Sequence, residues 1–326
     1  MIDGEFDLIA RFIERLPAPG PEVLVASGDD AAVADHEGPV VVSVDAIVEG
    51  VHFERPTFSP VDIGRKALAA AISDLAAMAA SPRHGYVVVG VPEGEREEDL
   101  LALADGIAAV SRSEEMAIIG GDVVRAPVLM VSVTAIGAEI DGVPLVTRSG
   151  AQHGEIVVVT GSIGGAAAGL EVLRKEGAGP ADQTLASRQL DPTPRVAAGQ
   201  LLSRAGATAM IDLSDGLIGD AGQLARASGV GIEIDLSEIP FQPGACEALS
   251  PDDEAGRIAA ASGGEDYELL ACLPESRVEE ARSSIEPICP LTAIGRVVKG
   301  TEALLVGEDG EVLPAGGFDH FSTGQA

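Results

Sequence analysis

The stretch from Ala209 to Leu217 carries two carboxylates and a hydroxyl at a point where a strand should give way to a helix. Apolar residues lead into Asp212 and Ser214, which share one side of an extended segment. Asp215 follows, where apolar residues begin to recur with helical spacing. Oxygen ligands grouped in this way favour a hard divalent cation. The alternative is that Asp215 is an ordinary helix N-cap, whose side chain accepts one backbone hydrogen bond.

Four further aspartates stand beside glycines, apolar runs or small residues in the first half of the chain. They are Asp30, Asp45, Asp74 and Asp122. Each of them taken alone also fits a solvated turn or an exposed helix position. A buried strand seldom carries an aspartate unless its carboxylate is paired, caps a helix or binds a metal. If all six carboxylates converge, they repel one another and take up protons unless cations neutralise them. Since every donor is an oxygen atom, the pattern favours Mg²⁺.

Other common kinds of site are not indicated. Five histidines and three scattered cysteines form neither a Cys/His zinc pattern nor a Ser-His-Asp arrangement. The glycine-rich turn at 161–169 lacks the Gly-Lys-Ser/Thr of a P-loop, so we interpret its glycines as positions of tight packing. A phosphoryl-transfer site fits better. Because the only lysines are Lys66, Lys175 and Lys299, metals must supply most of the charge that offsets repulsion between two phosphate-bearing substrates.

Strands and helices alternate in both halves of the chain, which indicates an α/β or α+β fold. Apolar runs predict strands near 40–45, 85–91, 116–121, 128–136, 155–160, 209–213, 231–236, 291–297 and 302–306. Helical periodicity predicts helices near 6–13, 61–80, 97–111, 195–205, 217–225 and 275–285. The polar, glycine- and proline-containing residues 177–194 are predicted to form a mobile loop. A break in the pattern near residue 150 predicts two domains, 1–148 and 149–326.

The composition excludes several classes of partner. The chain of 326 residues has a formal net charge of -31, which repels nucleic acid and anionic membranes. Cys246, Cys272 and Cys289 are an odd number and widely spaced, which favours a reducing cytoplasm. The longest apolar stretch is too short to span a bilayer. Acidic enrichment with few lysines also suits a protein that works in concentrated salt.

Seven segments, in this order along the chain, together resemble the thiamine-monophosphate kinase family. That family belongs to the superfamily of aminoimidazole ribonucleotide synthetase and selenophosphate synthetase. The segments are residues 28–31, 43–45 with 50–53, 73–78, 120–122, 147–150, 211–216 and 262–269. One segment alone would be weak evidence for this family. The whole set is specific to the family, and the resemblance extends from about Gly4 to Phe321.

The resemblance implies a two-domain fold and an activity. The N-terminal domain would be a mixed sheet with helices that pairs in a homodimer, and the C-terminal domain would be α/β. The chain would use ATP and several Mg²⁺ ions to phosphorylate thiamine monophosphate to thiamine diphosphate. The nucleophile would be a phosphate oxygen, which is already ionised, so no dedicated catalytic base is expected.

The resemblance also implies roles for particular residues. Metals would be held by Asp30, Ser43, Asp45, Asp74, Asp122, Asp212 and Asp215. ATP would be held by Gly121, Asp122, Arg148 and Ser214, and the thiamine side by His52, Glu265 and Phe318. Ala104 departs from the pattern, since an aromatic residue against the nucleotide is expected near this position.

Some alternatives remain open at this point. The acceptor could be that of another ATP-dependent synthetase of the same superfamily, although the chain lacks the reactive cysteine expected of a selenophosphate synthetase. The chain could also be a non-catalytic acidic protein that binds divalent cations. His52 could be a packing residue, and Phe318 could be part of a C-terminal plug over the edge of the core.

Overall fold

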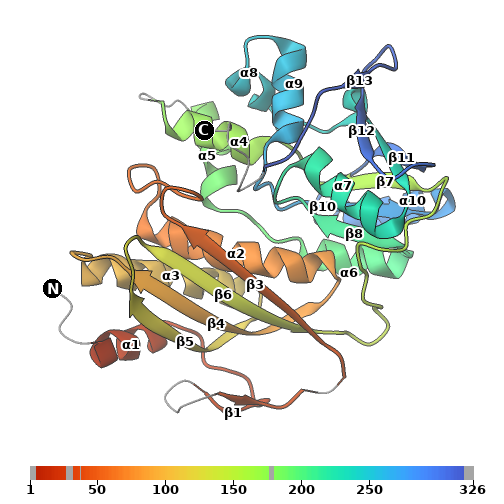
Figure 1. Cartoon of the computed structure of the whole chain (residues 1–326). Helices are drawn as coiled ribbons and strands as arrows, with labels where there is room; N and C mark the ends of the chain where they lie inside the picture. The colour runs from red at the N-terminus through yellow and green to blue at the C-terminus, as the bar shows by residue number, and fades with distance from the viewer. Residues whose placement is uncertain (1–4, 27–31, 37, 176–179, 319–326) are drawn as a thin grey trace. The chain divides into compact units, whose positions relative to one another are not determined.

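The computed structural model describes residues 5–26, 32–36, 38–175 and 180–318. The chain divides into two compact units, each with its own sheet and helices (Figure 1). The first unit comprises Met1–Leu75 and Ala80–Ile140, and the second comprises Ala76–Ala79 and Asp141–Ala326. The domain boundary between residues 148 and 149 remains a prediction.

A four-stranded mixed sheet forms the centre of the first unit. Its strands, in spatial order, are β3 (Val40–Val48), β6 (Met130–Ala138), β4 (Ser81–Val91) and β5 (Ala117–Arg125). Strand β6 is antiparallel to both of its neighbours, whereas β4 and β5 are parallel. A separate two-stranded sheet pairs β1 (Val23–Val25) with β2 (Val33–Ala34). The expected mixed sheet in the N-terminal part of the chain is therefore confirmed.

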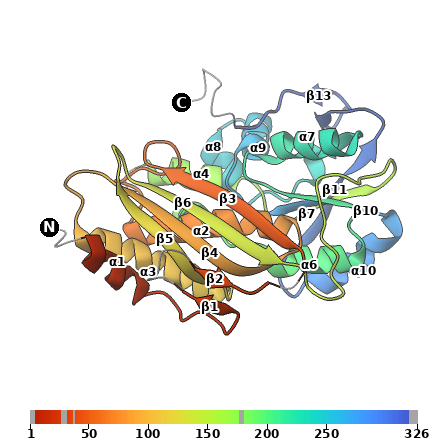
Figure 2. The same cartoon turned by 60° about the horizontal axis from the view of Figure 1, so that its bottom comes forward.

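Helices cover one face of this sheet. They are α1 (Glu5–Ile13), α2 (Pro60–Ala77) and α3 (Glu97–Ser113), and Figure 2 shows α2 and α3 behind the strands. The two helices cross at van der Waals contact of their backbones, because a Cβ atom at Gly64 would overlap the carbonyl oxygen of Leu103. The opposite face of strand β3 is apolar but exposed: Val42 is 57% and Val44 is 67% accessible.

The second unit is built on a seven-stranded sheet. The spatial order is β13 (Val312–Leu313), β12 (Ala303–Val306), β9 (Gly231–Asp235), β11 (Leu291–Val298), β7 (Ile156–Thr160), β10 (Leu269–Leu273) and β8 (Ala209–Asp212). Only the β9–β12 pair is parallel, and the other pairs are antiparallel. Every residue of β7, β8 and β10 is buried, which explains why these strands are apolar except for Thr160 and Asp212 at their ends.

The second unit also contains several helices. They are α4 (Gly165–Leu173), α5 (Pro180–Leu190), α6 (Val196–Ala205), α7 (Leu217–Ser228), α8 (Ala245–Leu249), α9 (Asp253–Ser262) and α10 (Val278–Ile285), with short 3₁₀ turns at Leu236–Glu238 and Glu275–Arg277. Helix α7 packs on β8, β9 and β12, while α6 packs with α10 (Figures 1 and 2). Within the described residues, no helix is long and apolar enough to cross a membrane.

The structure corrects three local predictions. Residues 180–190 of the predicted mobile loop form helix α5, with Leu185 buried against α4 and α8. Asp45 does not close its strand, since β3 continues to Val48. Asp122 likewise lies inside β5, which continues to Arg125, rather than at its end.

Candidate active site

Strand β3 and helix α2 bring two of the predicted metal ligands into contact. The hydroxyl of Ser43 donates a hydrogen bond to the carboxylate of Asp74. Asp45 lies two residues further along β3 and therefore faces the same side of the sheet as Ser43. Its Oδ1 atom accepts a 2.7 Å hydrogen bond from the amide of Ala46. Ser43, Asp45 and Asp74 are thus grouped by the fold, whereas Asp30 lies outside the described residues.

Asp122 does not join this group within the first unit. It lies on β5, the strand at the opposite edge of the sheet from β3. Three strand spacings separate the two edges, which corresponds to about 14 Å. Asp122 is exposed, and its Oδ1 atom accepts a 2.9 Å hydrogen bond from the amide of Val123. Its neighbour Gly121 has a structural reason to lack a side chain, because a Cβ atom there would overlap the carbonyl of Val87.

Two hydrogen bonds hold His52 in place, one to its ring and one to its backbone carbonyl. Its Nδ1 atom accepts a 3.1 Å hydrogen bond from the amide of Val48, so the neutral ring carries its proton on Nε2. Its carbonyl oxygen accepts a 2.8 Å hydrogen bond from the Nζ of Lys66. Lys66 is fully buried, with its ammonium 5.1 Å from the centre of the Phe58 ring. A buried cation therefore fixes the turn on which His52 stands.

Ala104 is not exposed to solvent. It is one of the fully buried residues of α3. The position of the adenine contact remains a prediction.

In the second unit, strand β8 ends at Asp212 and helix α7 begins at Leu217, as the sequence predicted. The N-cap of α7 is Gly216, with φ of 110°, so the interpretation of Asp215 as the helix cap is wrong. The loop between β8 and α7 is stabilised by the buried Asp220, whose Oδ2 atom accepts 3.0 Å hydrogen bonds from the amides of both Ser214 and Asp215.

The carboxylates of this corner are close enough to affect one another. Asp212 and Asp220 are each only 3% exposed. Burial, followed by the negative charge of Asp212, raises the pKa of Asp220 to about 8. The Asp212, Ser214, Asp215 and Asp220 corner is therefore a crowded set of oxygen atoms whose repulsion a bound cation would relieve. The donor set fits Mg²⁺, which binds oxygen. Among the described residues, however, no three acidic, histidine or cysteine side chains form a ready-made metal centre.

A second segment, residues 262–268, lies directly against this corner. The amide of Glu265 donates to the carbonyl of Ser214 at 2.8 Å, and the amide of Leu213 donates to the carbonyl of Glu268 at 2.8 Å. The contact needs glycine, because a Cβ atom at Gly264 would overlap the Ser214 carbonyl. The structure thus places Glu265, a predicted thiamine residue, beside Ser214, a predicted ATP residue. Glu265 has a left-handed φ of 68°, a conformation that costs a non-glycine residue energy and is common at functional sites.

Buried polar contacts hold the 262–268 segment in place. Glu268 is 1% exposed and accepts hydrogen bonds from Thr160, Arg188 and Arg195. The buried carboxylate of Asp266 accepts hydrogen bonds from the amides of Gly164 and Ala166 at the start of α4. The glycine-rich turn before α4 therefore binds the chain's own carboxylate, in agreement with the tight packing that we predicted there.

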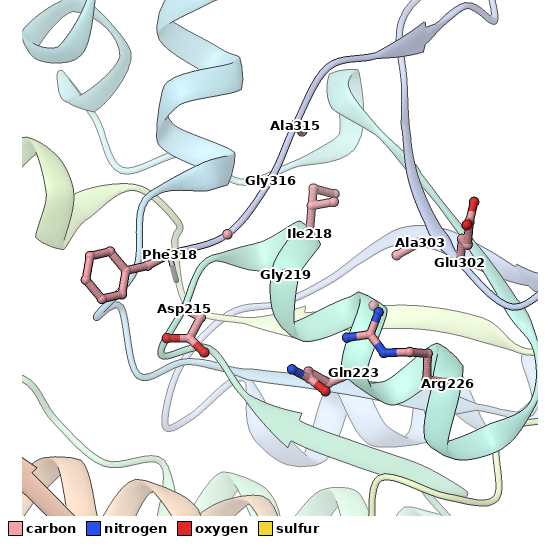
Figure 3. Close-up of a pocket in the computed structure, with 12 residues that line it drawn as sticks. Asp215, Ile218, Gly219, Gln223, Arg226, Glu302, Ala303, Ala315, Gly316 and Phe318 are labelled. Carbon is pink, nitrogen blue, oxygen red and sulfur yellow. The ribbon is translucent and has the colours of Figure 1, made fainter. Parts of the chain in front are cut away.

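The C-terminal segment reaches the same corner. The amide of Phe318 donates a 2.8 Å hydrogen bond to the carbonyl of Asp215. Figure 3 shows the groove that results, with a volume of about 360 Å³, between α7 and residues 315–318. Asp215 and Phe318 line one end of the groove, and Gln223 and Arg226 line the other. Phe318 is 42% exposed, so it is not buried as a plug over the core.

Arg148 lies apart from the corner. Its carbonyl oxygen accepts a 2.9 Å hydrogen bond from the hydroxyl of Ser228, which is the last residue of α7. Ser214 and Asp215 precede the first residue of the same helix, and a helix of 12 residues is about 18 Å long. The structure thus brings Asp212, Ser214, Asp215, Glu265 and Phe318 together, and it places Arg148 at the far end of α7.

Sequence reasoning missed Asp220, Glu268 and the two arginines that contact Glu268. Asp220 had a local signal, since it lies in the first turn of the helix that follows the acidic motif. Glu268 lies in the segment 262–269 that carries the family resemblance, but its ion pairs had no local signal, because Arg188 and Arg195 are 80 and 73 residues away from it in the chain.

Comparisons with known proteins identify the family. The family model "AIR synthase related protein, N-terminal domain" matches residues 28–138, and "AIR synthase related protein, C-terminal domain" matches residues 152–307. Thiamine-monophosphate kinase of Escherichia coli K12 is 37% identical to this chain, over 99% of this chain and 100% of that protein. Thiamine-monophosphate kinase of Bacillus subtilis is 36% identical, over 97% of this chain and 99% of that protein.

Solved structures agree with this result. The crystal structure of thiamine-monophosphate kinase from Stenotrophomonas maltophilia matches with a TM-score of 0.81 and 34% identity, over 94% of this chain and 96% of that one. The structure of AaThiL complexed with AMPPCP and TMP matches with a TM-score of 0.77 and 30% identity, over 86% of this chain and 87% of that one. The resemblance and the two-domain fold inferred from the sequence are confirmed, and the chain belongs to the thiamine-monophosphate kinase family of AIR synthase related proteins.

Proposed function

We propose that this chain is a thiamine-phosphate kinase, which transfers the γ-phosphate of ATP to thiamine monophosphate and so forms thiamine diphosphate and ADP. The chain is 37% and 36% identical, over almost its whole length, to thiamine-monophosphate kinases of Escherichia coli and Bacillus subtilis, which supports the activity. So does a relative that binds AMPPCP, an ATP analogue, together with TMP. The observation that carries the proposal in this chain is the corner at Asp212–Asp215, where Glu265 and Phe318 meet the acidic motif. The reducing environment favoured by its three free cysteines supports a cytoplasmic location.

The residues divide into two groups by the substrate they would contact. Gly121, Asp122, Arg148 and Ser214 would bind ATP. His52, Glu265 and Phe318 would bind the thiamine part of the acceptor, which is flat and cationic and therefore suits a carboxylate and an aromatic face. Because the attacking phosphate oxygen is ionised at neutral pH, the protein needs no general base, and its contribution is the alignment of the two phosphates for in-line transfer.

Several Mg²⁺ ions complete the proposed site. Asp30, Ser43, Asp45, Asp74, Asp122, Asp212 and Asp215 would hold them. Bound there, the ions would neutralise the charge that develops between the two phosphate groups during transfer. The contact between Ser43 and Asp74, and the influence of Asp212 on the pKa of Asp220, both fit cation binding by oxygen atoms.

A homodimer that pairs the N-terminal sheets is also proposed. Its support is the exposed apolar face of the edge strand β3, formed by Val40, Val42 and Val44, which are 43%, 57% and 67% accessible. Monomeric proteins rarely leave such a row of apolar side chains in water. Light scattering on the purified protein tests the proposal, which predicts twice the mass of one chain; the mass of one chain would contradict it.

Asp212→Asn tests the role of the acidic corner. The exchange keeps the size of the side chain and removes its charge, so turnover of thiamine monophosphate should fall by a factor of about 100 or more. The metal-free protein should keep its melting temperature or gain stability, because repulsion with Asp220 is relieved. Asp309→Asn, the same exchange in an exposed turn, is the matched control and should keep wild-type turnover. Equal turnover in the two variants would contradict the proposal.

A further inference from the structure

The segment that carries Phe318 lies on helix α7 through a contact between two glycines. An ideal Cβ atom at Gly317 would lie 2.9 Å from the Cα of Gly219 and 3.0 Å from the carbonyl oxygen of Asp215. A Cβ atom at Gly219 would lie 3.0 Å from the Cα of Gly317. The obstacle in each case is backbone, which cannot rotate away as the end of a side chain can. A side chain at either position would therefore force the two segments apart by a few tenths of an ångström.

This contact fixes where Phe318 stands. Its amide donates to the carbonyl of Asp215 at 2.8 Å, one residue beyond the contact between the glycines. Figure 3 shows Phe318 and Asp215 at the same end of the groove, with Gly219 beside them on the first turn of α7. A shift of residues 316–317 away from α7 would lengthen this hydrogen bond and move the aromatic ring relative to Asp215.

We propose that Gly219 is a positioning residue for the acceptor substrate: by lacking a side chain, it lets residues 316–318 lie against α7 and places Phe318 beside Asp215. This inference rests on the proposed function, in which Phe318 contacts the thiamine part of the acceptor. Gly219 itself touches neither substrate. Its effect is on the position of Phe318 and therefore on the binding of thiamine monophosphate, not on ATP.

Gly222 provides a matched control one turn further along the same helix. A Cβ atom there would lie 3.3 Å from a terminal nitrogen of Arg226, which is exposed and can move aside. Both glycines are inside α7, and alanine favours a helix more than glycine does, so neither exchange should destabilise the helix by itself. The two variants therefore differ in whether the added methyl group meets the C-terminal segment.

The experiment compares Gly219→Ala, Gly222→Ala and Phe318→Ala with the wild type in steady-state kinetics. We expect Phe318→Ala to raise the KM for thiamine monophosphate about threefold to tenfold, since loss of one aromatic contact to a cation has an effect of this order. Gly219→Ala should raise the same KM, by no more than Phe318→Ala does, because it displaces the ring without removing it. The kcat, the KM for ATP and the Tm should stay near their wild-type values. Gly222→Ala should match the wild type in kcat and in both KM values, and its Tm should equal or slightly exceed the wild-type value.

Hydrogen exchange at the amide of Phe318 gives a second readout that needs no substrate. Gly219→Ala should accelerate this exchange, and Gly222→Ala should not. If Phe318→Ala raises the KM and Gly219→Ala does not, the positioning role is refuted while the proposed function stands. If Phe318→Ala leaves the KM unchanged, the proposed role of Phe318 fails and the inference fails with it. Unchanged exchange in Gly219→Ala would refute the contact itself.

Discussion

Glu268→Gln should cost the protein far more stability than the same exchange at a surface ion pair. The Glu268 carboxylate is 1% exposed and accepts 2.7 and 2.6 Å hydrogen bonds from Arg195, 2.9 Å from Arg188 and 2.8 Å from Thr160. The side chains of Arg195 and Arg188 are themselves only 14% and 22% exposed. Glutamine would present an NH₂ group to guanidinium donors and remove the negative charge with which both of these largely buried cations pair.

The size of the effect follows from this burial. Removing one partner of a buried ion pair costs about 3–5 kcal/mol. Because both arginines keep some contact with water, we expect a value near the lower end, about 3 kcal/mol. The control is Glu280→Gln, whose partner is Arg277. Their side chains are 58% and 55% exposed, and such pairs contribute about 1 kcal/mol or less.

Urea denaturation of both variants, followed by circular dichroism, measures the free energy of unfolding. The expected result is a clear loss for Glu268→Gln and almost none for Glu280→Gln. A loss below about 1 kcal/mol for Glu268→Gln, or equal losses in the two variants, would refute the view that this buried ion cluster holds the turn that carries Glu265.

Two more predictions concern buried carboxylates. Burial raises the pKa of Asp266 from 3.8 to about 7, so between these values the folded state binds more protons than the unfolded state. The difference in the free energy of unfolding between the wild type and Asp266→Asn should therefore fall as the pH rises from about 4 to about 7. The fall should be at most about 1.4 kcal/mol per pH unit. A difference that is independent of pH would contradict this. Asp220→Ala removes the acceptor of the Ser214 and Asp215 amides and should raise the Mg²⁺ concentration for half-maximal turnover, whereas Asp220→Asn keeps an acceptor oxygen and should raise it less. A Mg²⁺ dependence of Asp220→Ala equal to that of the wild type would show that this loop does not set metal affinity.

Elements with a strong local signal were predictable from the sequence. The buried strand β7 begins with four consecutive apolar residues, and the motif at Asp212–Asp215 lies at the strand-to-helix connection that its pattern indicated. Helix α5 was not predictable in this way, because its sequence is polar over most of its length. It is stabilised by Leu185, which packs with Val172 and Ala245 from other helices. Such tertiary packing cannot be recognised from the local sequence pattern.

The site was predictable in its residue types more than in its geometry. The adjacency of Ser43 and Asp74 depends on the packing of α2 against β3, and the separation of Asp45 from Asp122 depends on the strand order β3-β6-β4-β5. Contacts between residues far apart in the sequence follow from such topology. The placement of Phe318 beside Asp215 is of the same kind, since it requires the C-terminal segment to return to α7.

The most direct test of the proposed function is the stoichiometry of the reaction with the purified, unmodified protein. Incubation with ATP, Mg²⁺ and thiamine monophosphate, followed by chromatographic separation of the products, should yield one thiamine diphosphate for each ADP formed. Omission of Mg²⁺ should abolish both products. The proposed activity would be contradicted by formation of ADP and free phosphate without thiamine diphosphate, or by turnover only with a different acceptor. No ADP with any acceptor would indicate a cation-binding protein without catalysis.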